Sequence, residues 1–371
     1  MYNKKFWATA FTLSGTTIGA GMLGLPYTFS KSGFLIGLSW LILLGAIMLF
    51  LNLSIGEVVL KTKTKHQLPG YTKKYLGKNA ERIMIFGMLF GIYSALIAYL
   101  VGEGESLSHI LPGNINPLYL GIFFWIIMTL LLREGLRELK KIETYGIIVI
   151  IIIIICIFIF FFTQINPQNL LTYHKENIIF PIGIILFSLM GFTSIPELGQ
   201  EIKGQEEDLK KAIIIGTLIP IFLYTIFTLT FIGVLGDNIS RIATLSFGPF
   251  ITVLGIFTML TSFFVLSFSL KDMFNYDLNI SNKSNFFLTS IVPLIIYIFI
   301  TIFNIDNFTA ILSIGGIIPA GLKGILILLI NKKVKEKIKS KNSLLEVPNN
   351  WLIIIFISLV LISAIILEII Y

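Results

Sequence analysis

Two short segments of the sequence combine glycine, small hydroxyl residues and proline within apolar runs. Residues 15–26 contain four glycines and Pro26, and residues 187–197 contain Gly191 and Pro196. Glycine and proline both weaken a helix, so each segment predicts an interruption. Interrupted backbone inside a membrane persists only where it lines a cavity or is buried in protein. The two segments could therefore bind a small polar molecule through their backbones.

The chemistry of these interruptions suits a zwitterion. A half-helix that begins after the first interruption presents free N–H groups and a positive dipole end, which can hold a carboxylate. Gly19, Ala20 and Gly21 leave that backbone bare, although Gly15 and Gly19 alone would also suit close helix packing. A half-helix that ends before the second interruption presents unpaired carbonyls, which can accept hydrogen bonds from an ammonium group. These are the carbonyls near Phe187, Ser188 and Leu189.

Three hydroxyl residues, Thr258, Thr261 and Ser262, form a second candidate site. Their spacing of i, i+3 and i+4 places them on one face of a helix. Hydroxyl and carbonyl oxygens suit a hard cation such as Na⁺. The same hydroxyls could instead bond to carbonyls of their own helix or pack against a neighbouring helix, and both interpretations stay open.

Three glutamates lie in or beside apolar runs. An ionisable residue within a membrane span is a functional candidate. Glu197 follows the second interruption and is the candidate for proton coupling, although it could also form a gate pair or accept hydrogen bonds from backbone N–H groups. Glu103 and Glu105 lie toward the outer half of their run, where we expect them at the membrane–water interface.

The elements that position these residues are predicted to be membrane-spanning helices. Of the 371 residues, 56% are apolar and 13% are charged, whereas soluble domains have roughly 45–50% and 25%. Runs of about 20 apolar residues can each cross a hydrocarbon core of about 30 Å. Their lack of alternation excludes an outer-membrane barrel. The predicted spans are residues 7–29, 33–56, 83–110, 117–132, 145–163, 177–199, 212–235, 247–270, 285–303, 306–330 and 350–370.

The positive charges predict the orientation of these spans. With the N-terminus in the cytoplasm, all of the 28 lysines and arginines except Lys31, Lys175 and Arg241 belong to cytoplasmic segments. This bias follows the positive-inside rule. The odd number of spans then places the C-terminus outside.

The two interruptions fall in the first and sixth spans. The sixth span lies five positions after the first. Because five is an odd number, the second copy of a five-helix unit is inverted, and the site is expected between the paired interruptions. The predicted fold is therefore an all-α polytopic membrane protein of 11 transmembrane helices, a 5+5 inverted repeat plus one extra helix. Residues 1–330 are the ten-helix core, with repeats at about 7–163 and 177–330; residues 331–349 are a basic cytoplasmic loop; residues 350–371 are the eleventh helix.

Other classes of protein fit the sequence less well. A membrane enzyme needs a nucleophile, paired acids or a metal set at one depth, and the three histidines lie in loops or near an outer end. A channel would show a continuous polar lining, and none is visible in the sequence. The single cysteine, Cys156, excludes an internal disulfide. We expect no enzymatic activity and no cofactor beyond a coupling ion. A non-transporting sensor of the same fold stays open, and ligand binding without flux would distinguish it.

Residues 15–26, Gly-Thr-Thr-Ile-Gly-Ala-Gly-Met-Leu-Gly-Leu-Pro, resemble the first-span signature of aromatic amino acid permeases. These form the tryptophan/tyrosine permease group of the amino acid–polyamine–organocation superfamily. Residues 191–203 and 209–213 also resemble amino acid permeases, and the resemblance covers essentially the whole chain. It implies a LeuT-like fold and secondary active transport of amino acids by alternating access.

The resemblance also implies where the substrate binds. The amides from Gly19 to Met22 would hold its carboxylate, and the carbonyls from Phe187 to Leu189 its amine. Side-chain selectivity would come from positions such as Tyr93, Ser94 and Thr258. The candidate substrate-binding residues are Thr16, Gly19, Ala20, Gly21, Met22, Phe187, Ser188, Leu189 and Phe192.

The resemblance leaves the coupling ion open between Na⁺ and H⁺. In sodium-coupled LeuT-like carriers, a hydroxyl face like that of the eighth span meets carbonyls of the first interruption. Some proton-coupled relatives place a lysine in span five instead, and residues 145–163 contain none. Carriers of the aromatic group are often regarded as proton symporters and can share the Thr-Ser pair. The candidate Na⁺ ligands are Gly15, Ile18, Thr258, Thr261 and Ser262.

We therefore expect a multi-pass carrier in the cell (plasma or inner) membrane that imports neutral, and among them aromatic, amino acids with Na⁺ or H⁺. A charged substrate would need a charged partner at the level of the interruptions, and the sequence offers no convincing one there. A cationic amino acid or polyamine transporter or exchanger is the alternative, for which Glu197 and Glu103 leave room. The expected partners are an amino acid substrate and membrane lipid, without nucleic acid or an obligate protein partner.

Overall fold

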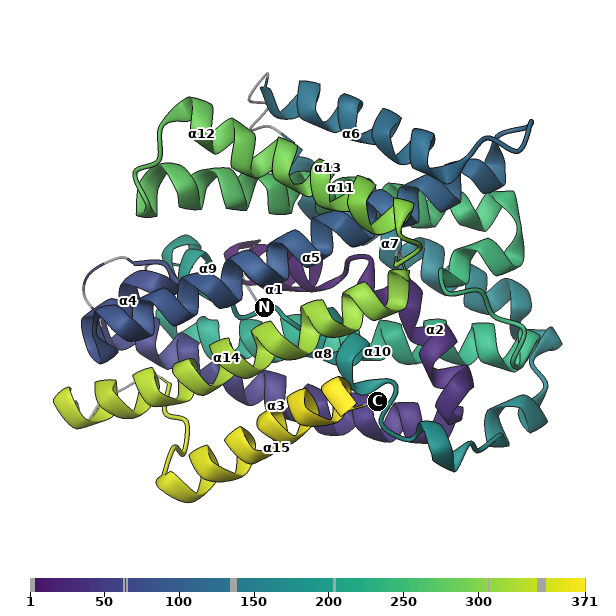
Figure 1. Ribbon diagram of the computed structural model, residues 1–371. Helices are drawn as coiled ribbons and strands as arrows, with labels where there is room; N and C mark the ends of the chain where they lie inside the picture. The colour runs from purple at the N-terminus through teal and green to yellow at the C-terminus, as the bar shows by residue number, and fades with distance from the viewer. Residues whose placement is uncertain are drawn as a thin grey trace.

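The computed structural model describes residues 4–62, 64, 66–133, 139–202, 205–305, 307–338 and 345–370, which form α-helices joined by short 3₁₀ turns, π-helical turns and loops. Figure 1 shows their arrangement. The helices are α1 Lys4–Thr17, α2 Gly21–Ser32, α3 Phe34–Lys61, α4 Leu68–Leu76, α5 Lys78–Ile110, α6 Pro117–Arg133, α7 Leu139–Phe161, α8 Ile182–Ser188, α9 Ile195–Glu201, α10 Leu209–Leu235, α11 Pro249–Asp272, α12 Asn282–Phe286, α13 Val292–Ile302, α14 Phe308–Lys337 and α15 Trp351–Ile370.

Both predicted interruptions are confirmed. The first span consists of α1 and α2 with residues 18–20 between them, and the sixth consists of α8 and α9 with residues 189–194 between them. Pro26 lies inside α2, and Pro196 is the second residue of α9. Proline is tolerated in the first turn of a helix because that N–H has no intrahelical partner. The helices therefore break at the glycine-containing segments, and the prolines belong to the half-helices that follow.

Eight helical segments in the described part of the chain are long and apolar enough to cross a membrane, and each coincides with a predicted span. Helix α6 is also apolar but has 17 residues. Because interruption leaves the first and sixth spans as short half-helices, length alone does not select them. The total of eleven spans depends on α6 and on these two interrupted pairs, and it stays a prediction.

The structure differs from the sequence-based expectation in two inner segments. Helix α4, whose Pro69 lies in its first turn, occupies part of the predicted inner loop between the second and third spans. Helix α14 continues to Lys337, so the first seven residues of the predicted basic loop 331–349 are helical. Residues 339–344 of that loop lie outside the described residues.

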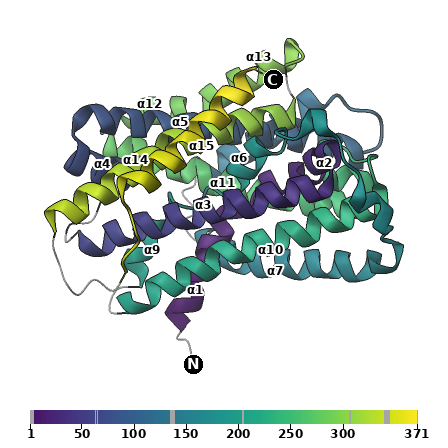
Figure 2. The same cartoon turned by 90° about the horizontal axis from the view of Figure 1, so that it is seen from below.

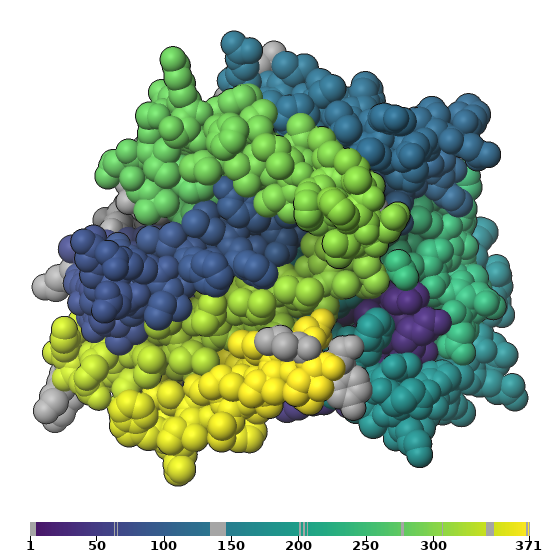
Figure 3. Space-filling model, viewed as in Figure 1, coloured from purple at the N-terminus to yellow at the C-terminus, as the bar shows by residue number. Residues whose placement is uncertain are grey.

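Helices α5 and α14 pack against each other through the middle of the molecule, and α14 also contacts α8, α3 and α15. Figure 1 and the perpendicular view in Figure 2 both show α15 beside α14. In the space-filling view, α15 forms part of the surface alongside α14 (Figure 3). The two interrupted helices meet this central pair through α8, which packs against both α14 and α2.

A cluster of charged and amide side chains joins the segment before α15 to the core. Glu57 of α3 is fully buried, and its carboxylate lies 2.8 Å from Lys61 Nζ and 3.3 Å from Lys335 Nζ. Asn331 Nδ2 and the Val347 backbone N–H donate to the same carboxylate at 3.0 and 3.2 Å. We call these five residues the inner cluster. Its carboxylate has partners from α3, α14 and the segment that leads into α15.

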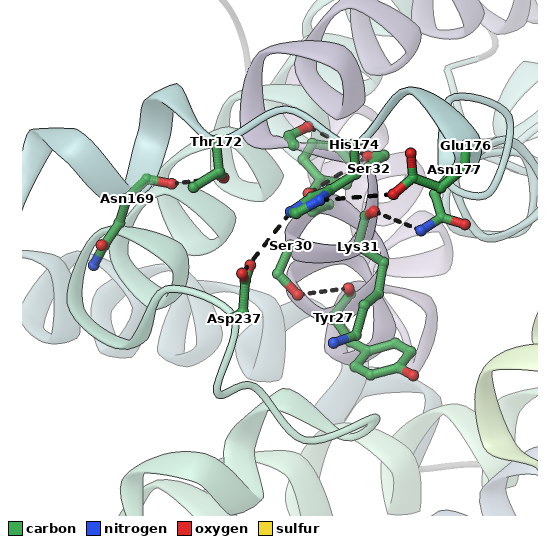
Figure 4. A network of polar contacts seen from close by, with 12 residues as sticks. Tyr27, Ser30, Lys31, Ser32, Asn169, Thr172, His174, Glu176, Asn177 and Asp237 are labelled. Carbon is green, nitrogen blue, oxygen red and sulfur yellow. Dashed lines mark hydrogen bonds and ion pairs between the residues drawn. The ribbon is translucent and has the colours of Figure 1, made fainter.

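The C-terminal end of α2 is held by the loop that precedes α8, as Figure 4 shows. The His174 backbone N–H donates to Ser32 O at 3.1 Å, and Asn177 Nδ2 donates to Lys31 O at 3.0 Å. The His174 ring lies 3.8 Å from a carboxylate oxygen of Asp237, beyond α10. These contacts satisfy carbonyls at the C-terminal end of α2, which would otherwise lack intrahelical partners.

Candidate substrate and cation sites

The two interruptions face each other across a very short distance. A Cβ atom built on Gly21 would lie 2.3 Å from Ser188 Oγ and 2.9 Å from Ser188 Cα, so only glycine allows this approach. The hydroxyls of Thr16 and Ser194 are 3.2 Å apart, which joins the end of α1 to the residue before α9. A side chain at Gly21 would therefore collide with the second interruption, not fill an open site.

Tyr224 of α10 connects the same two interruptions. Its fully buried hydroxyl lies 2.9 Å from the carbonyl oxygens of both Thr17, the last residue of α1, and Ser188, the last residue of α8. One hydroxyl hydrogen is shared between these two acceptors. Sequence reasoning missed Tyr224, because a tyrosine inside an apolar span carries no sign of its distant partners.

The amides of the first interruption partly match the predicted carboxylate site. The N–H groups of Gly19, Ala20 and Gly21 donate to no backbone carbonyl in the described part of the chain, whereas the Met22 N–H donates to Gly19 O at 3.2 Å. The Tyr99 hydroxyl of α5 interacts with the Ala20 backbone. The structure thus leaves three of the four predicted amides without a backbone acceptor and adds Tyr99, which the sequence did not single out.

The carbonyls of the second interruption are not unpaired, so that part of the prediction is wrong. Phe187 O accepts from the Met190 N–H at 3.3 Å, and Leu189 O accepts from the Gly191 N–H at 2.9 Å. Ser188 O accepts from Tyr224. The chain folds into tight turns here, which satisfy its own acceptors. Each carbonyl oxygen has a second lone pair, so an ammonium group could still bind as an additional donor.

Four of the five predicted cation ligands line one small pocket of about 20 Å³, large enough for roughly one water-sized particle. The fifth, Thr258, does not line it: its buried hydroxyl donates to Leu254 O at 2.7 Å. The Thr261 hydroxyl donates to Phe257 O at 3.0 Å, which leaves its oxygen free to accept a cation. The lining comes from α1, the first interruption, α7 and α11 and comprises Gly15, Ile18, Gly146, Ile147, Ile150, Thr261, Ser262 and Val265.

The cation pocket adjoins the first interruption through Ser262. A Cβ atom on Gly19 would lie 3.1 Å from both Ser262 Oγ and the Tyr99 hydroxyl oxygen. These two side chains also interact with each other. Tyr99 therefore contacts the candidate carboxylate site on one side and a cation-pocket residue on the other.

The structure changes the interpretation of the glutamates. Glu197 lies on the exposed surface of α9 and accepts a hydrogen bond from Gln67 Nε2 at 3.1 Å, and its role in proton coupling stays a prediction. Glu103 is fully buried within the protein, so it is not the solvent-exposed side chain that an interfacial position suggests. Neither of its carboxylate oxygens has a hydrogen-bond partner among the described residues.

Lys323 is a further buried charge that sequence reasoning placed incorrectly. It was assigned to the inner loop, but it lies within α14 with 4% of its surface exposed. Its Nζ is 5.2 Å from the ring centroid of Phe192, which is fully buried in the second interruption. The signal that could have revealed it is its position, since it lies within the predicted span 306–330.

The fold is shared with a helical transporter of known structure. The manganese transporter of Eremococcus coleocola matches 98% of this chain and 94% of its own, with a TM-score of 0.61 and 12% sequence identity. A likeness at this identity concerns the fold alone.

The sequence comparison identifies the family. The model of the tryptophan/tyrosine permease family matches residues 2–368, and the chain belongs to this family. A tyrosine-specific transport system of Haemophilus influenzae is 26% identical over 240 residues, 64% of this chain but only 59% of that protein. Glutamine transporter 2 of Aliivibrio fischeri is 22% identical over 338 residues, 85% of this chain and 86% of its own. This protein is thus a membrane-spanning member of an amino acid permease family.

Proposed function

We propose that this protein imports neutral amino acids, aromatic ones among them, by cation-coupled symport with alternating access. The observation that carries the proposal is the contact between the two interrupted helices at Gly21 and Ser188, beside a pocket lined by hydroxyl groups. The relatives named above transport tyrosine and glutamine, both neutral amino acids.

The proposed substrate site lies at the two interruptions. The amides of Gly19 and Gly21, together with the Ala20 amide and the Tyr99 hydroxyl that interacts with it, would bind the carboxylate. The second lone pairs of the carbonyls of Phe187, Ser188 and Leu189 would bind the amine, and Thr16 and Phe192 would lie beside the side chain. Because Gly21 touches Ser188, the two interruptions must separate to admit a substrate.

A cationic amino acid or polyamine is disfavoured by Lys323. When it is protonated, Lys323 beside Phe192 would repel a second cation in the same low-dielectric surroundings. The coupling ion, Na⁺ or H⁺, would use the pocket of Gly15, Ile18, Thr261 and Ser262 or a titrating side chain.

We further propose a LeuT-like 5+5 arrangement within the amino acid–polyamine–organocation superfamily, in the cell membrane, with the N-terminus inside and the C-terminus outside. The equivalent positions of the interrupted pairs α1–α2 and α8–α9 support the inverted repeat. The lysine and arginine bias supports the orientation.

Uptake by the purified protein in liposomes tests the proposal. A mixture of radiolabelled amino acids is supplied with an inward Na⁺ gradient at equal pH, and then with an inward proton gradient without Na⁺. Accumulation above the external concentration under either gradient is expected, and competition by unlabelled amino acids would identify the substrate. Absence of both accumulation and saturable exchange would overturn the proposed function.

A further inference from the structure

Lys323 occupies a place built for a long side chain but lacks a charged partner. Gly87 and Gly91 of α5 face it, and Cβ atoms on these glycines would lie 3.3 Å from Lys323 Cγ and 3.7 Å from its Nζ. Over the described residues, it makes no ion pair or hydrogen bond, and the ring of Phe192 is the group its ammonium faces. The two glycines, one helical turn apart on α5, therefore make room for the side chain of Lys323 in the middle of the bundle.

A buried ammonium group without a counter-charge is expensive to maintain. By contrast, Lys61, whose side chain is 8% exposed, is paired directly with the fully buried Glu57. An aromatic ring face attracts a cation more weakly than a carboxylate does, so it lowers the cost of the charged form without fixing it. Lys323 is thus placed where both its charged and its neutral forms are accessible.

Other titratable groups on the helices packed against α14 lie at different levels or have partners. Glu103 of α5 lies near the start of α14, because Gly102 packs against Phe308, about 22 Å along α14 from Lys323. Glu368 of α15 interacts with Ser313, about three turns before Lys323. Five further groups engage other residues. Glu57 belongs to the inner cluster, Glu81 pairs with the ammonium of Lys73, and the Tyr75 hydroxyl bonds with that of Thr62. Tyr93 donates to the carbonyl of Leu288, and Tyr99 interacts with the hydroxyl of Ser262.

We propose that Lys323 binds and releases the transported proton, and that Phe192 couples this step to the movement of the second interruption. The proposal rests on the proposed cation-coupled transport. Neutral Lys323 accepts one proton from the outer solution and becomes an ammonium group, which the Phe192 ring face stabilises. When the interruption moves and withdraws Phe192, the ammonium loses this stabilisation and releases the same proton to the inner solution.

This assignment explains why the ammonium group of Lys323 faces the ring of Phe192. Phe192 lies in the non-helical segment 189–194 between α8 and α9, whereas Lys323 lies in the continuous helix α14. A movement of the half-helices would therefore change their contact while leaving the backbone around Lys323 unchanged. The proton would be held only while the second interruption has the arrangement seen here.

The test uses Lys323→Met, with Lys333→Met as the matched control. Lys333 is on the same helix but is exposed and paired with Glu336. Each protein is placed in liposomes. Accumulation of a radiolabelled substrate is driven by an inward proton gradient, and exchange of internal for external substrate is measured at equal pH on both sides, from acidic to alkaline pH.

We expect the wild type and Lys333→Met to accumulate substrate with the proton gradient and to exchange it with a marked pH dependence. Lys323→Met should lose this accumulation, a fall of up to about tenfold, which is the limit that a gradient of one pH unit can sustain with one proton per neutral substrate. Its exchange should persist within about threefold and become independent of pH, since neutral methionine fits the same groove. A merely structural lysine would not remove this pH dependence.

Three further variants keep the test decisive if Lys323→Met folds poorly. Lys323→Arg keeps a cation that cannot release its proton, and it should bind substrate but not accumulate it. Phe192→Leu removes the ring face, and the exchange profile should move toward more acidic pH, whereas Phe192→Tyr should leave it unchanged.

Proton-driven accumulation by Lys323→Met or Lys323→Arg would overturn the proton site. So would loss of substrate binding, measured directly, in folded Lys323→Met, because Lys323 would then be a substrate ligand. Wild-type uptake driven by Na⁺ without pH dependence would overturn the proton site and leave the proposed function standing. Absence of both uptake and exchange in the wild type would instead reject the proposed function itself.

Discussion

The inner cluster and the middle of the bundle both contain buried charged groups, but the two regions differ in whether those groups have ionic partners. Glu57 is surrounded by two lysines, one asparagine and one backbone N–H, and these partners come from three separate segments. Glu103 and Lys323 are equally hidden from solvent but have no ionic partner among the described residues. A paired buried charge holds a structure together, whereas an unpaired one is tolerated where the charge itself is used. The inner cluster is therefore expected to affect stability, and the middle of the bundle to affect transport.

The largest effect should come from breaking the inner cluster. Glu57→Gln leaves Lys61 and Lys335 without their counter-charge and should lower the free energy of unfolding by about 3 kcal/mol, as for a broken buried ion pair. Thermal unfolding in detergent measures the loss. Glu81→Gln is the control, because the partner of Glu81, Lys73, is 60% exposed and the change should cost less than about 1 kcal/mol. Equal losses in the two variants would remove the distinction.

A smaller effect, on transport instead of stability, should follow from a methyl group at the first interruption. In Gly19→Ala the new Cβ lies 3.1 Å from the hydroxyls of Tyr99 and Ser262, which must move apart. We expect kcat/KM for uptake to fall by about tenfold, or about 1.4 kcal/mol. Gly24→Ala is the control on α2, since its closest neighbour is the terminal methyl of Ile184. Equal kcat/KM for Gly19→Ala and wild type would contradict the site.

The cation pocket should give a still smaller change. If Na⁺ is a coupling ion, replacing Thr261 and Ser262 together by alanine removes two oxygen ligands and should raise the Na⁺ concentration for half-maximal uptake by about fivefold, or about 1 kcal/mol. Thr258→Ala separates the predicted five-residue site from the pocket, because Thr258 does not line it. A similar rise in Thr258→Ala would restore the five-residue site, and uptake that never depends on Na⁺ would contradict both.

The smallest effect on stability is expected at Glu103. Glu103→Gln preserves the shape of a side chain that has no hydrogen bond to lose among the described residues, so the free energy of unfolding should change by less than about 0.5 kcal/mol. Thermal unfolding beside Glu57→Gln provides the comparison. A loss as large as that of Glu57→Gln would show that Glu103 has a stabilising partner.

The sequence was sufficient for features that depend on local chemistry. Glycine content placed both helix interruptions, and apolar length placed the uninterrupted spans. Helix periodicity placed Thr261 and Ser262 on one helix face. These features follow from backbone freedom, helix periodicity and solvent, all of which act within a few residues. The family resemblance, and not local spacing, implied that Thr261 and Ser262 meet Gly15 and Ile18, and the four residues line one pocket.

Features that depend on contacts between distant segments were not predictable. Tyr224 meets Ser188 across 36 residues and Thr17 across 207, and neither distance leaves a pattern in the sequence. The carbonyls of the second interruption were expected to be free because its turns were not foreseen. Lys323 was counted among the cytoplasmic lysines although it lies within the predicted span 306–330, and an ionisable residue inside a span is a functional candidate.

The inner cluster also sets an order of events during synthesis. Glu57 and Val347 are separated by 290 residues, so at about 5–20 residues per second the carboxylate emerges from the ribosome roughly 15–60 s before this last partner exists. The nearby Lys61, one helical turn away, can neutralise it during that interval. Assembly of the inner cluster thus reports that the chain has been translated through residue 347, and a nascent chain stopped earlier would present an incompletely bonded acid to the cell's quality-control machinery.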